Sequence, residues 1–416
     1  MNRILAAGRM RITNPNYISQ QMFDVEFAMH HVSKTAMRFL LCLSLVLVPA
    51  ACFAQSGEAL DQSAQTIRLK LLTDFAFETD NLMISSASRL ALDGDWAYIT
   101  SPDGYVLRAY GLGQKTQWEV IFRPKARFIN GIYVFDHVLY VLTEPEKDGD
   151  HVLFRSTDRG NTFEAIDQGL LDCNAFNCGY LYSTQLYATG QLIFVNAGGG
   201  KNLFVTDDIG QTYHVLSGTL ESQSCYHSTF DIRNRSVLMG GECGLDMPFL
   251  DRGHLSEDKL ELDETLAPAD TPYLGNRKVN DIRRQPGTPL VLAGAEGSLL
   301  RSTDNGKSFT FVFEYPMDGT YYPYVGRILF PLTRPDFVLI GGFDKVEGDL
   351  PYLAIGSNDG TAWNDLSYLF KNFQSGSVTD LKEDQDGRLL AVVVDSTKNT
   401  VSVFQIKVPP RAVPPS

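Results

Sequence analysis

Arg301-Ser302-Thr303-Asp304-Asn305-Gly306-Lys307-Ser308-Phe309 is a nonapeptide that occurs more than once in this chain of 416 residues. Arg155-Ser156-Thr157-Asp158-Arg159-Gly160-Asn161-Thr162-Phe163 is nearly the same, and Val205-Thr206-Asp207-Asp208-Ile209-Gly210-Gln211-Thr212-Tyr213 is a looser third copy. A recurring motif indicates similar structural units that stack on one another, because one unit alone cannot bury its apolar face. The repeat therefore predicts one repetitive domain rather than several unrelated ones.

The aromatic residue that ends each copy gives the length of the unit. Phe163 and Tyr213 are 50 residues apart, and Tyr213 and Phe309 are 96 apart, close to twice 48. Trp118 ends a degenerate copy, and Trp363 ends a copy that is one residue short. The gap between 213 and 309 predicts a unit with a degraded motif, whose remnant we place at 250–253.

Short strand patterns fill each unit, and no apolar period of 3.6 residues appears. Alternating segments such as 279–282 and 378–381 precede apolar runs that end in small residues, as at 290–297 and 337–342. Four strands in about 50 residues are typical of a propeller blade. The units are 82–122, 129–168, 180–217, 225–266, 279–315, 324–370 and 377–408.

The last unit contains only three strands, and the isolated strand pattern at 67–72 supplies the fourth. Such a joint leaves no free edge in the ring. The sequence thus predicts an all-β fold, a seven-bladed β-propeller over residues 66–408 closed by an N-terminal strand in the last blade. Six or eight blades fit the spacing less well.

The N-terminal region has the pattern of a secretory signal peptide. Met37 and Arg38 form a basic start, residues 39–48 are apolar, and Cys52 and Ala54 occupy the small-residue positions of a cleavage site. We interpret residues 1–54 as leader and signal peptide, with Met37 as a possible start, 55–65 as a polar linker and 409–416 as a Pro-rich tail. Periplasmic or secreted localisation after cleavage near Ala54 follows.

Two alternatives exist for this segment. Cys52 is the position of a lipoprotein cysteine, but Pro49 stands where such a motif has Leu. An uncleaved anchor is disfavoured because the apolar run is shorter than the roughly 20 residues that span a bilayer.

Four cysteines remain after cleavage: Cys173, Cys178, Cys225 and Cys243. An even number in an oxidising compartment favours disulfides, with three possible pairings. We favour Cys173–Cys178 and Cys225–Cys243 because each pair is local. A zinc site of four thiolates is the alternative, and it lacks the usual C-x2-C spacing.

Charge and motifs exclude several function classes. The net charge of −13 argues against a nucleic-acid ligand, which needs a basic face. The sequence contains no phosphate-binding P-loop, no G-x-S-x-G and no H-E-x-x-H. We therefore predict no cofactor, no metal and no membrane span, and we expect a monomer.

The repeated nonapeptide resembles the Asp-box, or BNR repeat, of sialidase-like propellers. Its residue types suit a turn, in which the Asp accepts backbone N–H groups two and three residues on, the Gly adopts a left-handed conformation and the aromatic packs between sheets. The resemblance implies a peripheral, structural role for nine residues: Asp158, Gly160, Phe163, Asp208, Gly210, Tyr213, Asp304, Gly306 and Phe309.

Propellers bind ligands at one end of the central channel, near the start of the innermost strands. Those positions carry the candidate ligand-binding residues Tyr226, His227, Asn280, Tyr324 and Arg327 and the candidate catalytic residues Asp281 and Asp380. The resemblance implies that a sialidase needs three arginines on the substrate carboxylate; Arg327 is one plausible inward arginine, and three cannot be placed in this sequence. Photosystem II assembly factor propellers resemble the strand pattern more closely, but this acidic chain shows no arginine-rich face.

Two functions follow from these expectations. The first is an exported, non-catalytic module that binds a protein or carbohydrate ligand on the channel face. The second is a divergent glycoside hydrolase or lyase that uses Asp281 and Asp380 as a carboxylate pair.

Overall fold

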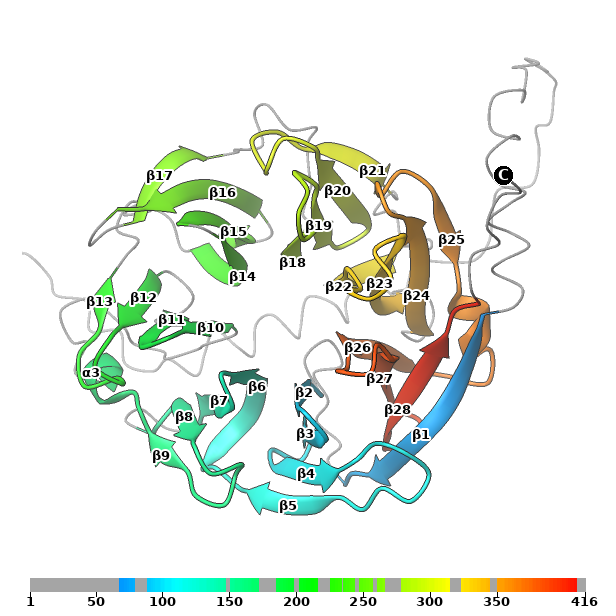
Figure 1. Ribbon diagram of the computed structural model, residues 1–416, viewed down its shortest axis with the longest axis horizontal. Helices are drawn as coiled ribbons and strands as arrows, with labels where there is room; N and C mark the ends of the chain where they lie inside the picture. The colour runs from blue at the N-terminus through cyan, green and yellow to red at the C-terminus, as the bar shows by residue number, and fades with distance from the viewer. Residues whose placement is uncertain are drawn as a thin grey trace, which may run out of the picture. The chain divides into compact units, whose positions relative to one another are not determined.

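The structure is a computed structural model of the protein. Short antiparallel strands joined by turns form nearly all of its described part. It describes residues 67–78, 88–146, 150–171, 185–197, 202–215, 225–233, 235–243, 247–256, 260–265, 278–314, 323–344 and 350–409. All of them belong to the unit of residues 53–416. Their 28 strands form seven four-stranded sheets around a common axis (Figure 1). The predicted seven-bladed β-propeller is confirmed.

Six blades each consist of four consecutive strands. Blade 1 contains β2 (Leu90–Asp93), β3 (Trp96–Thr100), β4 (Val106–Tyr110) and β5 (Glu119–Phe122). Blade 2 contains β6 (Ala126–Phe135), β7 (Val138–Pro145), β8 (Leu153–Ser156) and β9 (Glu164–Ala165). Blade 3 contains β10 (Leu186–Thr189), β11 (Leu192–Ala197), β12 (Asn202–Thr206) and β13 (His214–Val215). Blade 4 contains β14 (Cys225–Arg233), β15 (Ser236–Cys243), β16 (Met247–Leu255) and β17 (Leu260–Thr265). Blade 5 contains β18 (Val279–Arg284), β19 (Val291–Ala295), β20 (Ser298–Ser302) and β21 (Thr310–Glu314). Blade 6 contains β22 (Pro323–Leu329), β23 (Phe337–Asp344), β24 (Leu350–Ser357) and β25 (Trp363–Asp365). Two single helical turns, α3 (Gln168–Leu171) and η2 (Ser367–Phe370), follow blades 2 and 6.

The seventh blade joins the two ends of the propeller. It contains β26 (Gly376–Glu383), β27 (Leu389–Asp395), β28 (Thr400–Lys407) and, at its outer edge, β1 (Arg68–Ala76). β1 pairs antiparallel with β28 from Arg68 opposite Lys407 to Ala76 opposite Thr400. The predicted closing strand is therefore confirmed, and it extends four residues beyond the predicted end at Leu72.

Blade 4 is a regular four-stranded sheet although it lacks the nonapeptide. The proposed remnant at 250–253 is wrong as a turn. These residues lie inside strand β16, where Asp251 is opposite Met239 and Gly253 is opposite Val237. A glycine inside a strand weakens it, but here β15 and β17 pair with β16 on both sides.

The nonapeptide connects the third and fourth strands of its blade. Ser302 Oγ accepts a hydrogen bond from the Gly306 N–H at 2.8 Å, and Asp304 accepts from the N–H groups of Lys307 and Ser308. The expected pattern of acceptance two and three residues on is thus shifted by one residue. The reason is that the Ser or Thr before the Asp takes the glycine N–H.

The glycine and the aromatic fix the turn against the preceding blade. Gly160, Gly210 and Gly306 have φ values of 84°, 81° and 83°, the left-handed region expected for them. Phe163 stacks on Phe122 of blade 1 with ring centroids 4.1 Å apart, and the Tyr213 hydroxyl donates to the Ile166 carbonyl after blade 2. These contacts give the repeat a structural role at the outer part of each sheet.

Several predictions fall outside the described residues. They concern the leader, the signal peptide, the linker, most of the tail, and Cys173 and Cys178. For Cys225 and Cys243 the structure gives the backbone register, which places the two residues directly opposite each other. No helix among the described residues is long and apolar enough to span a membrane.

Candidate ligand site in the central channel

The first strand of each blade forms the channel wall (Figure 1). Five of these seven strands have an irregularity where they pair with the second strand. The register shifts between Ile129 and Gly131, His227 and Thr229, Val279 and Asp281, Val325 and Arg327, and Val378 and Asp380. A bulge of this kind interrupts the ladder of backbone hydrogen bonds and redirects the side chains next to it.

Side chains just after this irregularity connect one blade to the next. Thr229 Oγ1 accepts the N–H of Ile282 at 3.3 Å, Asp281 Oδ2 accepts that of Ile328 at 2.9 Å, and Asp380 Oδ2 accepts that of Leu90 at 2.9 Å. The Gln185 amide accepts from the Phe230 N–H and donates to the Phe230 carbonyl. We call the equivalent positions of the seven blades the belt: Arg89, Gly131, Gln185, Thr229, Asp281, Arg327 and Asp380.

Side chains two residues beyond the belt lie on the same strand face as the belt residues, since a strand alternates with a period of two. These seven positions line a cavity of about 510 Å³ together with some belt residues. They hold Ala91, Tyr133, Tyr187, Asp231, Arg283, Leu329 and Lys382. We refer to this space as the channel cavity.

The channel cavity has an aromatic side on blades 2 and 3. Tyr133 stacks on Phe135 with ring centroids 6.2 Å apart, and Phe135 meets Tyr187 edge-on at 5.5 Å. The belt residue Gly131 makes room for this arrangement, because a Cβ there would lie 2.7 Å from the Tyr133 ring. Burial raises the pKa of Tyr133 to about 12, so the phenol stays protonated at neutral pH.

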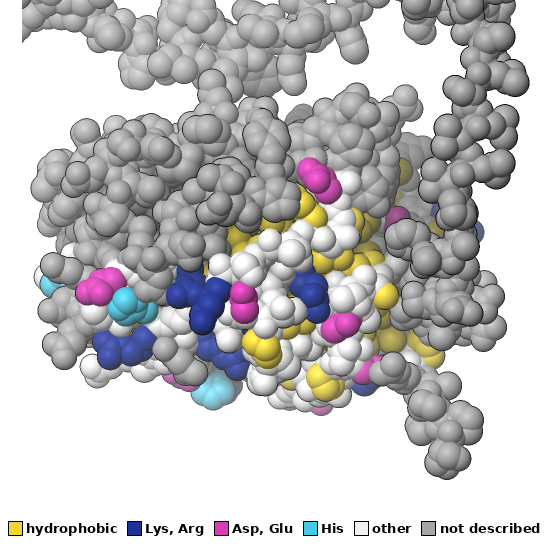
Figure 2. All heavy atoms as spheres, turned by 90° about the horizontal axis from the view of Figure 1, so that it is seen from above, with side chains coloured by type: hydrophobic (Ala, Val, Ile, Leu, Met, Phe, Trp, Pro, Cys, Tyr) yellow, Lys and Arg dark blue, Asp and Glu magenta, His cyan; other side chains and the backbone are white. Residues whose placement is uncertain are grey.

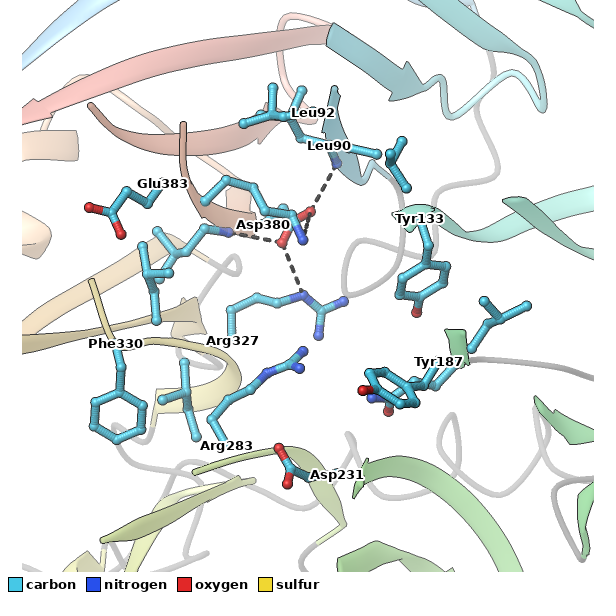
Figure 3. A pocket seen from close by; sticks show the side chains of 18 of the residues that line it. Leu90, Leu92, Tyr133, Tyr187, Asp231, Arg283, Arg327, Phe330, Asp380 and Glu383 are labelled. Atoms are coloured by element: carbon cyan, nitrogen blue, oxygen red, sulfur yellow. Dashed lines mark hydrogen bonds and ion pairs between the residues drawn. The ribbon is translucent and has the colours of Figure 1, made fainter. Parts of the chain in front are cut away.

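The side of the cavity formed by blades 5 to 7 is cationic. Figure 3 shows Arg283 and Arg327 extending into the cavity toward Tyr133 and Tyr187. Arg283 Nε lies 3.0 Å from Asp281, and the Arg283 side chain is 41% exposed. Arg327 Nε donates to the Thr379 carbonyl at 3.0 Å and lies 3.8 Å from Asp380.

Cations outnumber carboxylates in this region. Arg89, Arg283, Arg327 and Lys382 surround two carboxylates, Asp281 and Asp380. Burial lowers the pKa of Arg89, and the charge of Asp380 opposes that shift. By contrast, the described part of the face in Figure 2 shows Lys and Arg side chains interspersed with Asp and Glu.

The cavity lining includes three more charged residues, Asp231, Arg284 and Glu383. Arg284 Nε lies 3.3 Å from Asp231, and Glu383 accepts backbone N–H groups of Leu332 and Thr333. Glu383 is thus directed toward blade 6, whereas the charge of Asp231 also acts on Arg283: Asp281 raises the pKa of Arg283 most, and Asp231 adds to that shift.

The structure brings together three of the predicted site residues, Asp281, Arg327 and Asp380, on the channel wall. Asn280 and Tyr324 bond to each other between blades 5 and 6, with the Tyr324 hydroxyl donating to Asn280 Oδ1 at 2.6 Å. Tyr324 also stacks on Phe343 at 4.5 Å. Tyr226 and His227 lie in strand β14, and their side chains are outside the described residues.

Both candidate catalytic carboxylates are used by the fold. Asp380 accepts the N–H groups of Leu90 and Leu381 with its two oxygens, and Asp281 holds the N–H of Ile328. Burial raises the pKa of Asp281, opposed by the Arg283 charge and by the bond from Ile328. Each of the two carboxylates therefore has a structural role.

The sequence interpretation missed Arg89, Tyr133, Tyr187, Arg283 and Lys382. It offered one inward arginine and no arginine-rich face, whereas the channel wall carries three arginines. A signal was present, since Arg283 and Lys382 each lie two residues after a predicted Asp on the same strand face. Among the described residues, no group of three His, Cys, Asp or Glu side chains is placed to hold a metal ion.

Solved structures with this architecture are numerous, although no protein-family profile and no curated protein matches the sequence. A structure of YCF48 bound to D1 peptide is 10% identical, with a TM-score of 0.56 over 83% of this chain and 98% of that chain. YCF48 from Cyanidioschyzon merolae is 13% identical, with a TM-score of 0.53 over 82% and 98% of the two chains. The extracellular domain of a putative one component system from B. thetaiotaomicron is 13% identical, with a TM-score of 0.53 over 81% of this chain and 40% of that one. At these identities the likeness concerns the fold.

Proposed function

We propose that this protein is an exported propeller of the Asp-box (BNR) type that binds a protein partner at the channel cavity without catalysing a reaction. One observation carries the proposal. The two candidate catalytic carboxylates, Asp281 and Asp380, are bound within the belt, while guanidinium groups and tyrosine rings face the cavity. Arg and Tyr are the side chains that dominate the energy of protein interfaces.

Two further observations support the proposal. A neighbour in fold, YCF48, has been determined with D1 peptide bound, so propellers of similar architecture hold polypeptide segments. The pattern of a basic start, an apolar run and a cleavage site at 37–54 supports export. Tyrosine rings also accept sugars by stacking, so the experiment below includes glycans.

The alternative is a glycoside hydrolase, and the raised pKa of Asp281 is the feature that favours it. A general acid needs such a shift. However, Asp281 Oδ2 accepts the Ile328 N–H and the same carboxylate pairs with Arg283, which fixes it as part of the wall. We therefore propose the binding function.

The test uses the mature protein as bait in extracts of the exported fraction of its source cells. We expect one stoichiometric protein partner that is retained by the wild type and by Arg155→Gln, and lost with Arg327→Gln. Arg155 pairs with Glu164 at the outer edge of blade 2 and serves as the matched control.

A parallel screen of aryl glycosides and polysaccharides tests the alternative. We expect neither turnover nor retention of a glycan. Turnover that disappears in Asp281→Asn, a variant that keeps an acceptor for Ile328, would overturn the binding proposal.

A further inference from the structure

Arg283 presents donors to the channel cavity that no described residue accepts. Its polar contacts with the described residues all pass through Nε to Asp281, at 3.0 Å to Oδ1 and 3.3 Å to Oδ2. Guanidinium carries five N–H donors in a planar fork, so both terminal nitrogens remain directed at the cavity. A fork of this kind matches the two oxygens of a carboxylate.

The surrounding charges favour an anion at the same place. Arg327 and Lys382 lie 3.8 Å and 3.6 Å from Asp380, so one carboxylate faces two cations, and Arg89 adds a third buried cation next to it. A cation held away from water is stabilised by an opposite charge more strongly than one at the surface. The excess arises within a chain whose net charge is −13.

The opposite side of the cavity is aromatic. Tyr133, Phe135 and Tyr187 present ring faces and edges from blades 2 and 3. Aromatic pairs of this geometry add to the energy gained by burying their area. The volume of about 510 Å³ lies in the range of pockets that take small ligands, so a short segment enters rather than a folded domain.

We propose that the channel cavity binds a short segment of the partner in which a carboxylate stands next to an aromatic side chain. The carboxylate lies on Arg283, with Arg327 and Lys382 close by, and the aromatic ring packs against Tyr187 and Tyr133. This inference rests on the proposed protein-binding function and names the chemistry that the site recognises. The carboxylate belongs either to an acidic side chain or to a chain terminus, and peptides distinguish the two.

Two matched pairs of peptides test the proposal by titration calorimetry with the mature protein. Acetyl-Phe-Asp-amide is compared with acetyl-Phe-Asn-amide, and acetyl-Gly-Phe with a free carboxyl end is compared with its amide. We expect at least one carboxylate peptide to bind about tenfold or more tightly than its neutral partner, because a hydrogen bond to a charged group contributes about 1.5–3 kcal/mol. The arm that shows the difference identifies the source of the carboxylate.

Variants assign the effect to the cavity. Arg283→Gln should remove the preference for the carboxylate peptide, and Tyr187→Leu should remove the preference for Phe over Ala in that peptide. Lys382→Gln is a second cation variant that does not contact the belt residue Asp281, and Arg155→Gln is the control. Thermal melting of each free variant verifies folding.

Equal affinity for the charged and neutral peptides, or no binding of any peptide at millimolar concentration, would overturn the inference. The inference would also be overturned if the variants Arg283→Gln and Lys382→Gln both kept the preference for the carboxylate peptide. Retention of the full partner by the wild type, without a carboxylate preference, would leave the binding function intact and remove only this inference.

Discussion

Gly210 combines two constraints that a side chain at this position violates. Its φ is 81°, and a Cβ would lie 1.7 Å from the Ile166 carbonyl oxygen between blades 2 and 3. The Tyr213 hydroxyl donates to the same Ile166 carbonyl at 2.7 Å, so the turn cannot move away from Ile166 without losing that bond. The glycine of the nonapeptide thus fixes both the turn and the approach of the neighbouring blade.

Gly210→Ala should therefore destabilise the protein strongly. We expect a loss of about 2–5 kcal/mol, from left-handed strain together with overpacking against Ile166. Gly190→Ala is the control, because Gly190 has a φ of 59° with nothing within 4 Å of its Cβ position. That variant should lose only about 1–2 kcal/mol. Urea unfolding measures both, and equal losses would contradict the packing argument.

The Asp of each nonapeptide is stabilised in its charged form. A hydrogen bond from the Thr212 hydroxyl, with others from Thr212 N–H and Thr206, lowers the pKa of Asp208 to about 2, and Thr162 does the same for Asp158. The folded pKa lies below the unfolded value of about 3.9. The stabilisation is therefore present above pH 4 and is lost as the pH falls toward 2.

Asp208→Asn tests this pH dependence. At pH 7 we expect the variant to have a lower urea midpoint than the wild type, and the difference should shrink steadily between about pH 4 and pH 2. Urea midpoints at several pH values measure it. A difference that stays constant down to pH 2 would show that the charge of Asp208 contributes nothing.

At the scale of elements, the sequence predicted strands and blades better than the functional surface. Blade length followed from the aromatic residues of the repeat, and the closing strand β1 followed from an unpaired apolar pattern. The prediction of a motif remnant at 250–253 was wrong because Asp and Gly are typical of a turn but here both lie in strand β16. Tyr133 was missed because the face of strand β6 that lines the channel depends on the bulge before it, which only the pairing register reveals. Arg283 was missed although it lies two residues after the predicted Asp281 on the same strand face.

Strands β14 and β15 make the predicted Cys225–Cys243 pairing testable. Residues directly opposite in an antiparallel pair have Cα atoms about 4.5–5.5 Å apart, within the span of a disulfide. In a Cys173→Ser, Cys178→Ser background, we expect no free thiols in the exported protein and a reduction-dependent loss of about 2–4 kcal/mol. Thiol titration of the unfolded protein and melting with and without reductant check this. Two free thiols would disprove the pairing.

At the scale of the whole molecule, ring closure depends on one strand at the start of the propeller. Leu72 of β1 packs in the same buried cluster as Val401 and Val403 of β28 and Leu90 of blade 1. Trp118 Nε1 also donates to Thr73 Oγ1 of β1, which connects blade 1 to blade 7. Removal of β1 therefore exposes apolar surface at the junction of the first and last blades and leaves β28 as an open edge.

The pairing register of β1 and β28 allows ring closure to be tested separately from the order of the strands along the chain. Arg68 at the start of β1 lies opposite Lys407 at the end of β28, so a permuted chain needs only a short hairpin loop to join the end of β28 to the start of β1. We expect a protein without residues 67–78 to aggregate or to lose its cooperative melting transition. A permuted chain that starts at Ser88 and carries 67–78 after 408 through a short Asn-Gly loop should melt within about 5 °C of the wild type, since a new loop changes stability by only about 1 kcal/mol. Melting and size-exclusion chromatography measure both. If the permuted chain behaves like the truncated one, closure requires the native order of strands, and pairing of β1 with β28 is insufficient to form the ring.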